Sequence, residues 1–229
     1  MELRNSHIIP EWVFTDLYDE KHRFNVMSTL PERPRPQEQK GLRERLLCND
    51  CEQQFSRYER YARGVVKGGE GLTVTRHPGR IEIADIDYEK FKLFQMSVLW
   101  RSGIASHRMF SRVKLGPHAE RLREMLLRED PGRRTDYPCL IFGVIAQGKS
   151  IPDFIDQPTR VRLDGLNCYR FIFCGLVWVF FVANHAPTRL ARQHVLTEAG
   201  GLVIWIKPFE DLGYLQEFGR DLHKLGRLP

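Results

Sequence analysis

The sequence predicts an α+β protein in which a small N-terminal module, residues 1–66, precedes a larger mixed domain with an antiparallel sheet, residues 67–229. Three observations support this fold class: a Cys-x-x-Cys turn directly before a helical pattern, two further helical stretches in the middle of the chain, and several strand-like segments after residue 137. A chain of 229 residues can bury a sizeable core without disulfide bonds.

The N-terminal module is expected to consist of two parts separated by a loop. Residues 30–41 contain three prolines and no apolar periodicity, which predicts an extended loop. After this loop, Asp50 can cap a helix whose apolar residues recur at helical spacing: Phe55, Tyr58, Ala62 and Val65. A cysteine turn that leads into a helix resembles the local layout of a treble-clef finger.

The larger domain is expected to begin with a β-hairpin, residues 72–76 and 80–84, around a His-Pro-Gly turn. Two helices should follow, at residues 87–101 and from Pro117 to about residue 130. Strands are predicted at residues 139–147, 159–163, 169–174, 176–184 and 202–207, and a closing helix at 210–225.

The cysteine content and the N-terminus indicate a cytoplasmic protein. Five cysteines at uneven spacings are atypical of a secreted disulfide framework and typical of a reducing compartment. No apolar segment of the secretory type follows the first residues. The most apolar run, residues 171–183, is shorter than the roughly 18 to 20 residues that span a bilayer, so we expect a buried strand and no membrane partner.

Positive charge is concentrated in the middle of the chain. The net charge is +6 and the isoelectric point is near 9.2, and residues 101–134 hold about nine basic side chains against four acidic ones. Four of these residues are candidate contacts to a nucleic-acid backbone: Arg101, Arg108, Arg112 and Lys114. The alternative is an ordinary solvated helix face, because Glu120, Glu124 and Glu129 interleave with the arginines.

Residues 143–150 match the phosphate-binding pattern G-x-x-x-x-G-K-S and follow a strand-like segment. A phosphate loop must lead into a helix whose N-terminus faces the phosphate. Here Pro152 and Pro158 leave too few residues for such a helix, so we interpret Gly148 and Lys149 as a turn. A nucleotide-using protein remains a weaker alternative that depends on Lys149.

The Cys48-Asn-Asp-Cys51 turn could direct two thiolates at one metal ion. A tetrahedral zinc site needs two more ligands, for which the candidates are His7, His22, Glu52 and Glu59. The alternative is a pair of reduced cysteines at a helix start. A redox pair is less favoured, because no thioredoxin-like βαβ pattern surrounds the two cysteines.

Two short elements of this module resemble the HNH endonucleases, whose ββα-metal finger has an Asp-His-Ile-x-Pro strand and a Leu-Cys-x-x-Cys-His/Asn element before the helix. The matching segments are Ser6-His7-Ile8-Ile9-Pro10 and Leu47-Cys48-Asn49-Asp50-Cys51-Glu52. Bacterial proteins with a SHIIP…LLCxxCE signature are similar, and in them a helical segment like residues 94–101 follows. Ser6 stands where the family has a metal-binding aspartate, Glu52 where it has histidine or asparagine, and the upstream Cys-x-x-Cys of zinc-bearing members is missing.

The resemblance implies a metal-dependent nuclease that hydrolyses DNA phosphodiester bonds, in the setting of bacterial anti-phage defence. His7 would be the general base and a metal ligand, Glu52 and Glu59 would be catalytic carboxylates, and Cys48 and Cys51 would hold metal. The implied cofactors are Mg²⁺ or Mn²⁺ for catalysis and a structural Zn²⁺. The alternative is a catalytically inactive treble-clef module that binds nucleic acid or protein, with a protein partner or a second copy of the chain.

Overall fold

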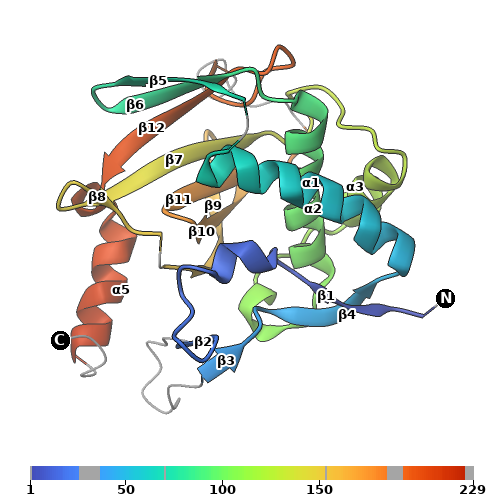
Figure 1. Cartoon of the computed structure of the whole chain (residues 1–229), viewed down its shortest axis with the longest axis horizontal. Coiled ribbons are helices and arrows are strands. Elements are labelled where there is room, and N and C mark those ends of the chain that lie inside the picture. Colours follow the sequence, from blue (N-terminus) through green and yellow to red (C-terminus); the bar gives the residue numbers. More distant parts are fainter. Residues whose placement is uncertain (1, 26–36, 70, 153, 185–192, 225–229) are drawn as a thin grey trace.

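The computed structural model describes residues 2–25, 37–69, 71–152, 154–184 and 193–224 and shows a mixed α+β fold (Figure 1). Most of the loop expected at residues 30–41 lies outside the described residues. Its described end forms β3 (Gln37–Gln39), which pairs with β2 (Arg23–Asn25).

The main sheet of the described residues has eight strands. Seven follow the order β5-β6-β12-β7-β11-β10-β9, and β8 pairs with β7. Their bounds are β5 Thr73–His77, β6 Arg80–Ala84, β7 Cys139–Ala146, β8 Lys149–Ser150, β9 Asp156–Leu163, β10 Leu166–Phe173, β11 Leu176–Phe181 and β12 Leu202–Pro208. All neighbours are antiparallel except β12 and β7, which are parallel. The predicted antiparallel sheet is therefore confirmed, with one parallel pair at its centre.

Four α-helices accompany the sheet in the described chain: α1 Asn49–Lys67, α2 Tyr88–Ile104, α3 His118–Leu127 and α5 Gly213–Lys224. Three short 3-10 turns are η1 Glu11–Phe14, η2 Arg108–Phe110 and η3 Phe209–Asp211. The side chain of Asp87 caps α2 by accepting from the backbone N–H of Lys90. The expectation that Asp50 caps α1 is wrong, because Cys48 occupies the N-cap position and the helix begins at Asn49.

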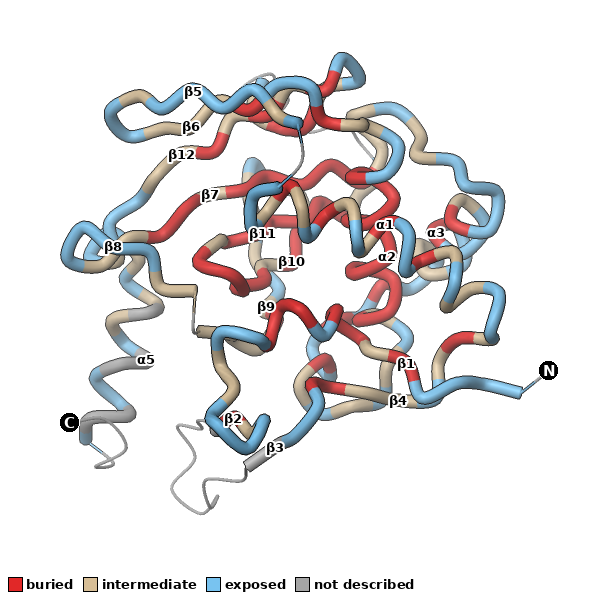
Figure 2. The backbone as a smooth tube through the Cα atoms, viewed as in Figure 1, coloured by how far each residue is buried: buried red, intermediate tan, exposed pale blue. Residues whose placement is uncertain are grey.

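Helix α2 is central to the fold. Every residue from 91 to 102 is buried, including charged Lys92 and Arg101 (Figure 2). A surface helix would show one polar stripe, so a helix buried on all sides must have protein around it. Here α1 and α3 pack against α2, and the sheet supplies aromatic residues to the same core.

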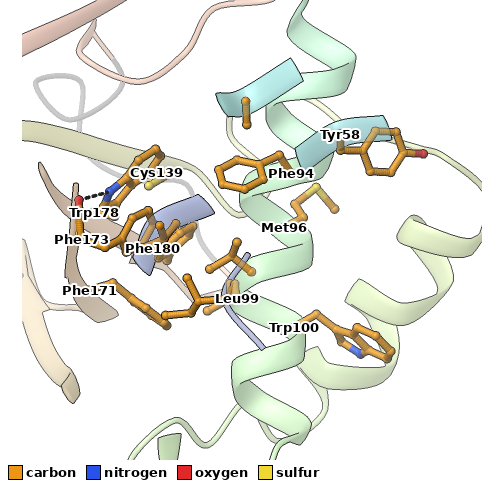
Figure 3. Packing of buried hydrophobic residues seen from close by; sticks show 14 of the residues in the cluster. Tyr58, Phe94, Met96, Leu99, Trp100, Cys139, Phe171, Phe173, Trp178 and Phe180 are labelled. Atoms are coloured by element: carbon orange, nitrogen blue, oxygen red, sulfur yellow. Dashed lines mark hydrogen bonds between the residues drawn. The ribbon is translucent and has the colours of Figure 1, made fainter. Parts of the chain in front are cut away.

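Alternate residues of the strands fill two hydrophobic clusters on opposite faces of the sheet. On the α2 face, the rings of Trp178 and Phe173 are stacked, with their centroids 4.7 Å apart. The centroids of Trp178 and of Phe94 on α2 are 6.2 Å apart (Figure 3). This cluster also contains Ile8 and Phe14, so residues on both sides of the predicted boundary at 66 share one core. The other face packs against Leu212 and its neighbours near α5.

The segment that matches the phosphate-loop pattern is a strand and a hairpin turn. Gly143 lies within β7, the turn residues Gln147 and Gly148 have positive φ, and Lys149 and Ser150 form β8. The interpretation of Gly148 and Lys149 as a turn is confirmed, since the pattern does not lead into a helix at Lys149.

None of the helices in the described part of the chain is long and apolar enough to cross a membrane.

Candidate functional site

The two sequence elements at the N-terminus lie on neighbouring elements of a strand–strand–helix unit. Strand β1 (Arg4–His7) pairs antiparallel with β4 (Arg43–Leu47), with His7 opposite Arg43, and α1 starts directly after the Cys48 turn. Figure 1 shows this pair of strands crossing beside the end of α2. The unit thus brings Ser6 near the first turn of α1.

Successive side chains of a strand point to opposite faces, and this separates Ser6 from His7. Ser6 is fully buried, and its hydroxyl donates a hydrogen bond to the carboxylate of Glu52 on α1. The imidazole of His7 lies instead with Lys40, Arg43 and Glu11. His7 and Glu52, both expected to be catalytic, therefore have different polar partners on different sides of β1.

The His7 ring is largely enclosed. Its Nε2 lies 2.9 Å from Nε of Arg43 and 3.1 Å from the carbonyl oxygen of Lys40. An unprotonated Nε2 accepts from Arg43, whereas a protonated Nε2 donates to Lys40, so protein groups occupy this nitrogen in either tautomer. Burial, and then the neighbouring Arg43 guanidinium, lowers the pKa of His7 below its ordinary value, which favours the neutral ring.

Gly41 makes this enclosure possible. Its φ is +69°, and a Cβ atom there would lie 3.1 Å from Cδ2 of His7 and 3.1 Å from Cδ2 of Phe14. Both the left-handed backbone and the close approach of the two rings favour glycine.

Arg101, expected to contact nucleic acid, is an internal cross-link that is only 2% exposed. Its Nη1 lies 2.6 Å from Oε1 of Glu59 and donates to the carbonyl oxygen of His7 at 2.7 Å. Its Nε donates to the carbonyl oxygen of Ser97, and its guanidinium lies over the ring of Phe55. Arg101 thus joins α2 to α1 and β1, and its partner Glu59, expected to be catalytic, is engaged in the same contact.

The side chains implied as metal ligands do not form a common donor set. Cys48 and Cys51 are free, half-buried thiols at the start of α1, while His7, Glu52 and Glu59 have the separate partners described above. Among the described residues, no group of three or more histidine, cysteine, aspartate or glutamate side chains could hold a metal ion. The arrangement therefore does not fit the Mg²⁺, Mn²⁺ or Zn²⁺ site that the HNH resemblance implies.

A second polar surface lies where the segment after α2 passes the edge strand β9. We define the basic strip as Arg112, Lys114, Arg160 and Arg162, all of which are exposed. The Oη of Tyr169 accepts from the backbone N–H of Lys114 at 3.0 Å and donates to its carbonyl oxygen at 2.6 Å. Tyr169 is the register partner of Arg160, and Asn167 that of Arg162.

The register places two of the four cations, Arg160 and Arg162, on one side of the sheet. Cross-strand partners share a face, as do residues two apart in a strand, so Arg160 and Arg162 lie on the face of Tyr169. Within the described residues, no carboxylate forms an ion pair with any of the four. Asp156, which the charge of Arg112 influences, already pairs with Arg170 at 3.5 Å.

Arg108, the remaining predicted contact residue, is exposed at the start of η2, next to the basic strip. Its carbonyl oxygen accepts from the side-chain amide of Gln157, which ties this segment to β9. Arg160 and Arg162 were not predicted as contact residues. Their signal in the sequence is two arginines at period two inside a predicted strand, which places both on one face.

Comparisons with known proteins returned no match: no family model, no curated protein and no solved structure is similar to this chain.

Proposed function

We propose that this protein binds DNA through the basic strip, with the N-terminal unit acting as a non-catalytic, treble-clef-like scaffold. The observation that supports this proposal is the contact of Tyr169 with the backbone of Lys114, which holds the exposed segment of Arg112 and Lys114 against β10, next to the edge strand β9 with its exposed Arg160 and Arg162. Exposed cations without carboxylate partners are free to neutralise phosphates and release the counterions that surround a duplex.

The N-terminal unit supports this surface mechanically. The carboxylate of Glu44 on β4 accepts from the backbone N–H of Ser106 at 2.9 Å and from that of His107 at 3.1 Å. Arg101 fixes the preceding turn of α2 to β1. Both contacts hold the start of the segment that carries Arg112 and Lys114.

The test measures binding of a fluorescent 30-base-pair duplex, chosen as a probe of about three helical turns, by anisotropy over a range of salt concentrations. The variant carries Arg112→Ala, Lys114→Ala, Arg160→Ala and Arg162→Ala. We expect the slope of log affinity against log salt to become shallower by about 0.9 for each phosphate that the variant no longer neutralises.

A matched control removes four other arginines, each of which is paired with a carboxylate. These are Arg57 with Glu129, Arg121 with Asp136, Arg123 with Glu120, and Arg134 with Glu198. The control changes the net charge by the same amount. If both variants bind the duplex with equally reduced affinity, binding reflects total charge and the basic strip is not the interface.

The second candidate is the metal-dependent DNA nuclease that the HNH resemblance implies. The lowered pKa of His7, at the end of β1, favours this candidate, because only an unprotonated imidazole can act as a general base. In the tautomer whose Nε2 donates to the carbonyl oxygen of Lys40, Nδ1 carries the lone pair, so the base would be Nδ1.

Incubation of purified protein with plasmid and Mg²⁺ or Mn²⁺ tests this candidate. Nicking by the unmodified protein that a folded His7→Ala variant no longer performs would support the nuclease. Nicking that is equal in His7→Ala and the unmodified protein would remove His7 from the reaction, and absence of nicking under both ions would leave DNA binding as the function.

A further inference from the structure

Two thiols meet at the start of α1. Cys48 occupies the N-cap position, with extended backbone angles (φ −75°, ψ 170°), and Cys51 lies in the first helical turn. Residues three apart on a helix lie on the same side. Both cysteines are free and half-buried, so the pair can be reached from solvent.

The environment makes the two thiols unequal. The backbone N–H of Cys51, and then its thiol, interacts with the Cys48 sulfur and lowers the pKa of Cys48. Burial, and then the Cys48 thiol, raises the pKa of Cys51 to about 11. A thiol of lowered pKa beside a thiol of raised pKa is the arrangement of an attacking and a resolving thiol.

The charged groups around the two cysteines have opposite effects on the pKa values of the thiols. The carboxylate of Asp50, between the two cysteines, opposes ionisation of both, although the backbone N–H of Asp50 favours that of Cys48. The guanidinium of Arg123 on α3 favours ionisation of Cys51. Arg123 itself pairs with Glu120, which limits its influence. The helix start therefore remains the main stabiliser of a Cys48 thiolate.

We infer that Cys48 and Cys51 form a redox-active dithiol that closes to a disulfide when it meets a small disulfide such as oxidised glutathione. The Cys48 thiolate attacks one sulfur of the oxidant, forms a mixed disulfide and releases one thiolate. Cys51 then loses its proton and attacks the Cys48 sulfur, which releases the second thiolate. Two electrons pass from the protein thiols to the oxidant, and its two thiolates take up the two protons.

Formation of the disulfide would affect the contact between α1 and β1. The first turn of α1 is held by the hydrogen bond from the backbone N–H of Glu52 to the carbonyl oxygen of Cys48, at 3.0 Å. Glu52 follows Cys51 directly and accepts from buried Ser6. A disulfide across this turn fixes the same residues that attach β1 to the helix.

The remaining cysteines provide an internal reference. Cys139 and Cys168 are at most 1% exposed and Cys174 is 9% exposed. Burial raises the pKa of each, to about 11 for Cys168 and about 12 for Cys174. Both factors slow thiol exchange, so these three should stay reduced in the folded protein.

The first experiment equilibrates the full chain, treated beforehand with a chelator, in buffers of varied reduced and oxidised glutathione. Free thiols are then alkylated, and the peptides are analysed by mass spectrometry. We expect a Cys48–Cys51 disulfide to appear in one transition while the three buried cysteines remain alkylatable after unfolding. Two thiols that stay reduced across the range, or zinc retained through the chelator treatment that protects both, would overturn the inference.

The second experiment uses variants that separate the two roles. Cys51→Ser should trap glutathione on Cys48, and Cys48→Ser should form neither the mixed nor the internal disulfide. In the unmodified protein at pH 7, Cys48 should be alkylated faster than Cys51, since its pKa is lowered while that of Cys51 is raised. Faster alkylation of Cys51 would contradict the assignment. Circular dichroism spectra establish that each variant is folded.

Discussion

Arg101 and Arg112 belong to the same basic segment of the sequence, yet they lie in opposite environments. Arg101 is enclosed by α1, α2 and β1 and has Glu59 as its partner, whereas Arg112 is exposed in the basic strip and has no ion pair among the described residues. A buried guanidinium must be paired and hydrogen-bonded, because removing it from water is costly. An exposed one keeps its hydration until a ligand arrives. Charge density along the sequence therefore does not by itself locate an interface.

The largest loss of stability should come from replacing Arg101, the buried arginine of the two. Arg101→Met leaves Glu59 and the carbonyl oxygen of His7 without their partner, so we expect a loss of about 3–5 kcal/mol in the free energy of unfolding. Urea denaturation measures this loss. Arg112→Met is the control, expected within about 0.5 kcal/mol of the unmodified protein. Equal losses in the two variants would refute the contrast.

A smaller loss of stability is expected from a substitution in α2 where this helix packs against Leu115. A Cβ atom on Gly103 would lie 2.2 Å from Cδ1 and 2.5 Å from Cγ of Leu115. Gly103→Ala should therefore cost about 1–3 kcal/mol by overpacking. The companion change Leu115→Ala makes room, so the double variant should lose less than the two single losses together. Strict additivity would show that the two residues do not meet.

The pH dependence of stability should reveal the enclosure of His7. Burial lowers the pKa of His7 below its ordinary 6.5, so the unfolded chain binds a proton at a higher pH than the folded one. The contribution of His7 to the free energy of unfolding is then fully present above pH 6.5. It is lost as the pH drops through the lower pKa of His7 in the folded protein. The free energy of unfolding should change with pH by less than the roughly 1.4 kcal/mol per pH unit that corresponds to the binding of one whole proton.

Urea denaturation at pH 5 and pH 7 measures this contribution. His7→Gln should be less sensitive to the pH change than the unmodified protein. A His7→Gln variant with an unchanged pH difference would show that the ring does not titrate with folding.

The smallest effect on stability is expected at the basic strip. Arg160 and Arg162 are exposed on an edge strand, and replacing either by alanine should change the free energy of unfolding by no more than about 0.5 kcal/mol. The same replacements should weaken DNA binding in low salt. A variant that loses stability and binding together would indicate that these side chains hold β9 in place.

Several elements could be predicted from local pattern alone. The predicted helix at 87–101 and the hairpin at 72–84 correspond to α2 and to β5 and β6 within a few residues, because capping, periodicity and turn residues are local. The turn at Gly148 was predicted for the same reason. The helix start at Asn49 was not, since Cys48 is an unusual N-cap residue and Asp50 a typical one.

The candidate site depended on information that local pattern does not contain. Ser6 and Glu52 are 46 positions apart and Arg101 and His7 are 94 apart, so their contacts arise only when β1, α1 and α2 pack together. The sequence by itself determined the α+β class, the main elements, the cysteine turn and the local excess of arginine. Only the tertiary structure decided which arginine is buried, that His7 and Glu52 have separate partners, and that Tyr169, the register partner of Arg160, contacts the backbone of Lys114. The physical reason is that hydrogen-bonded turns and periodic burial are set by neighbours in sequence, whereas the pairing of charges is set by neighbours in space.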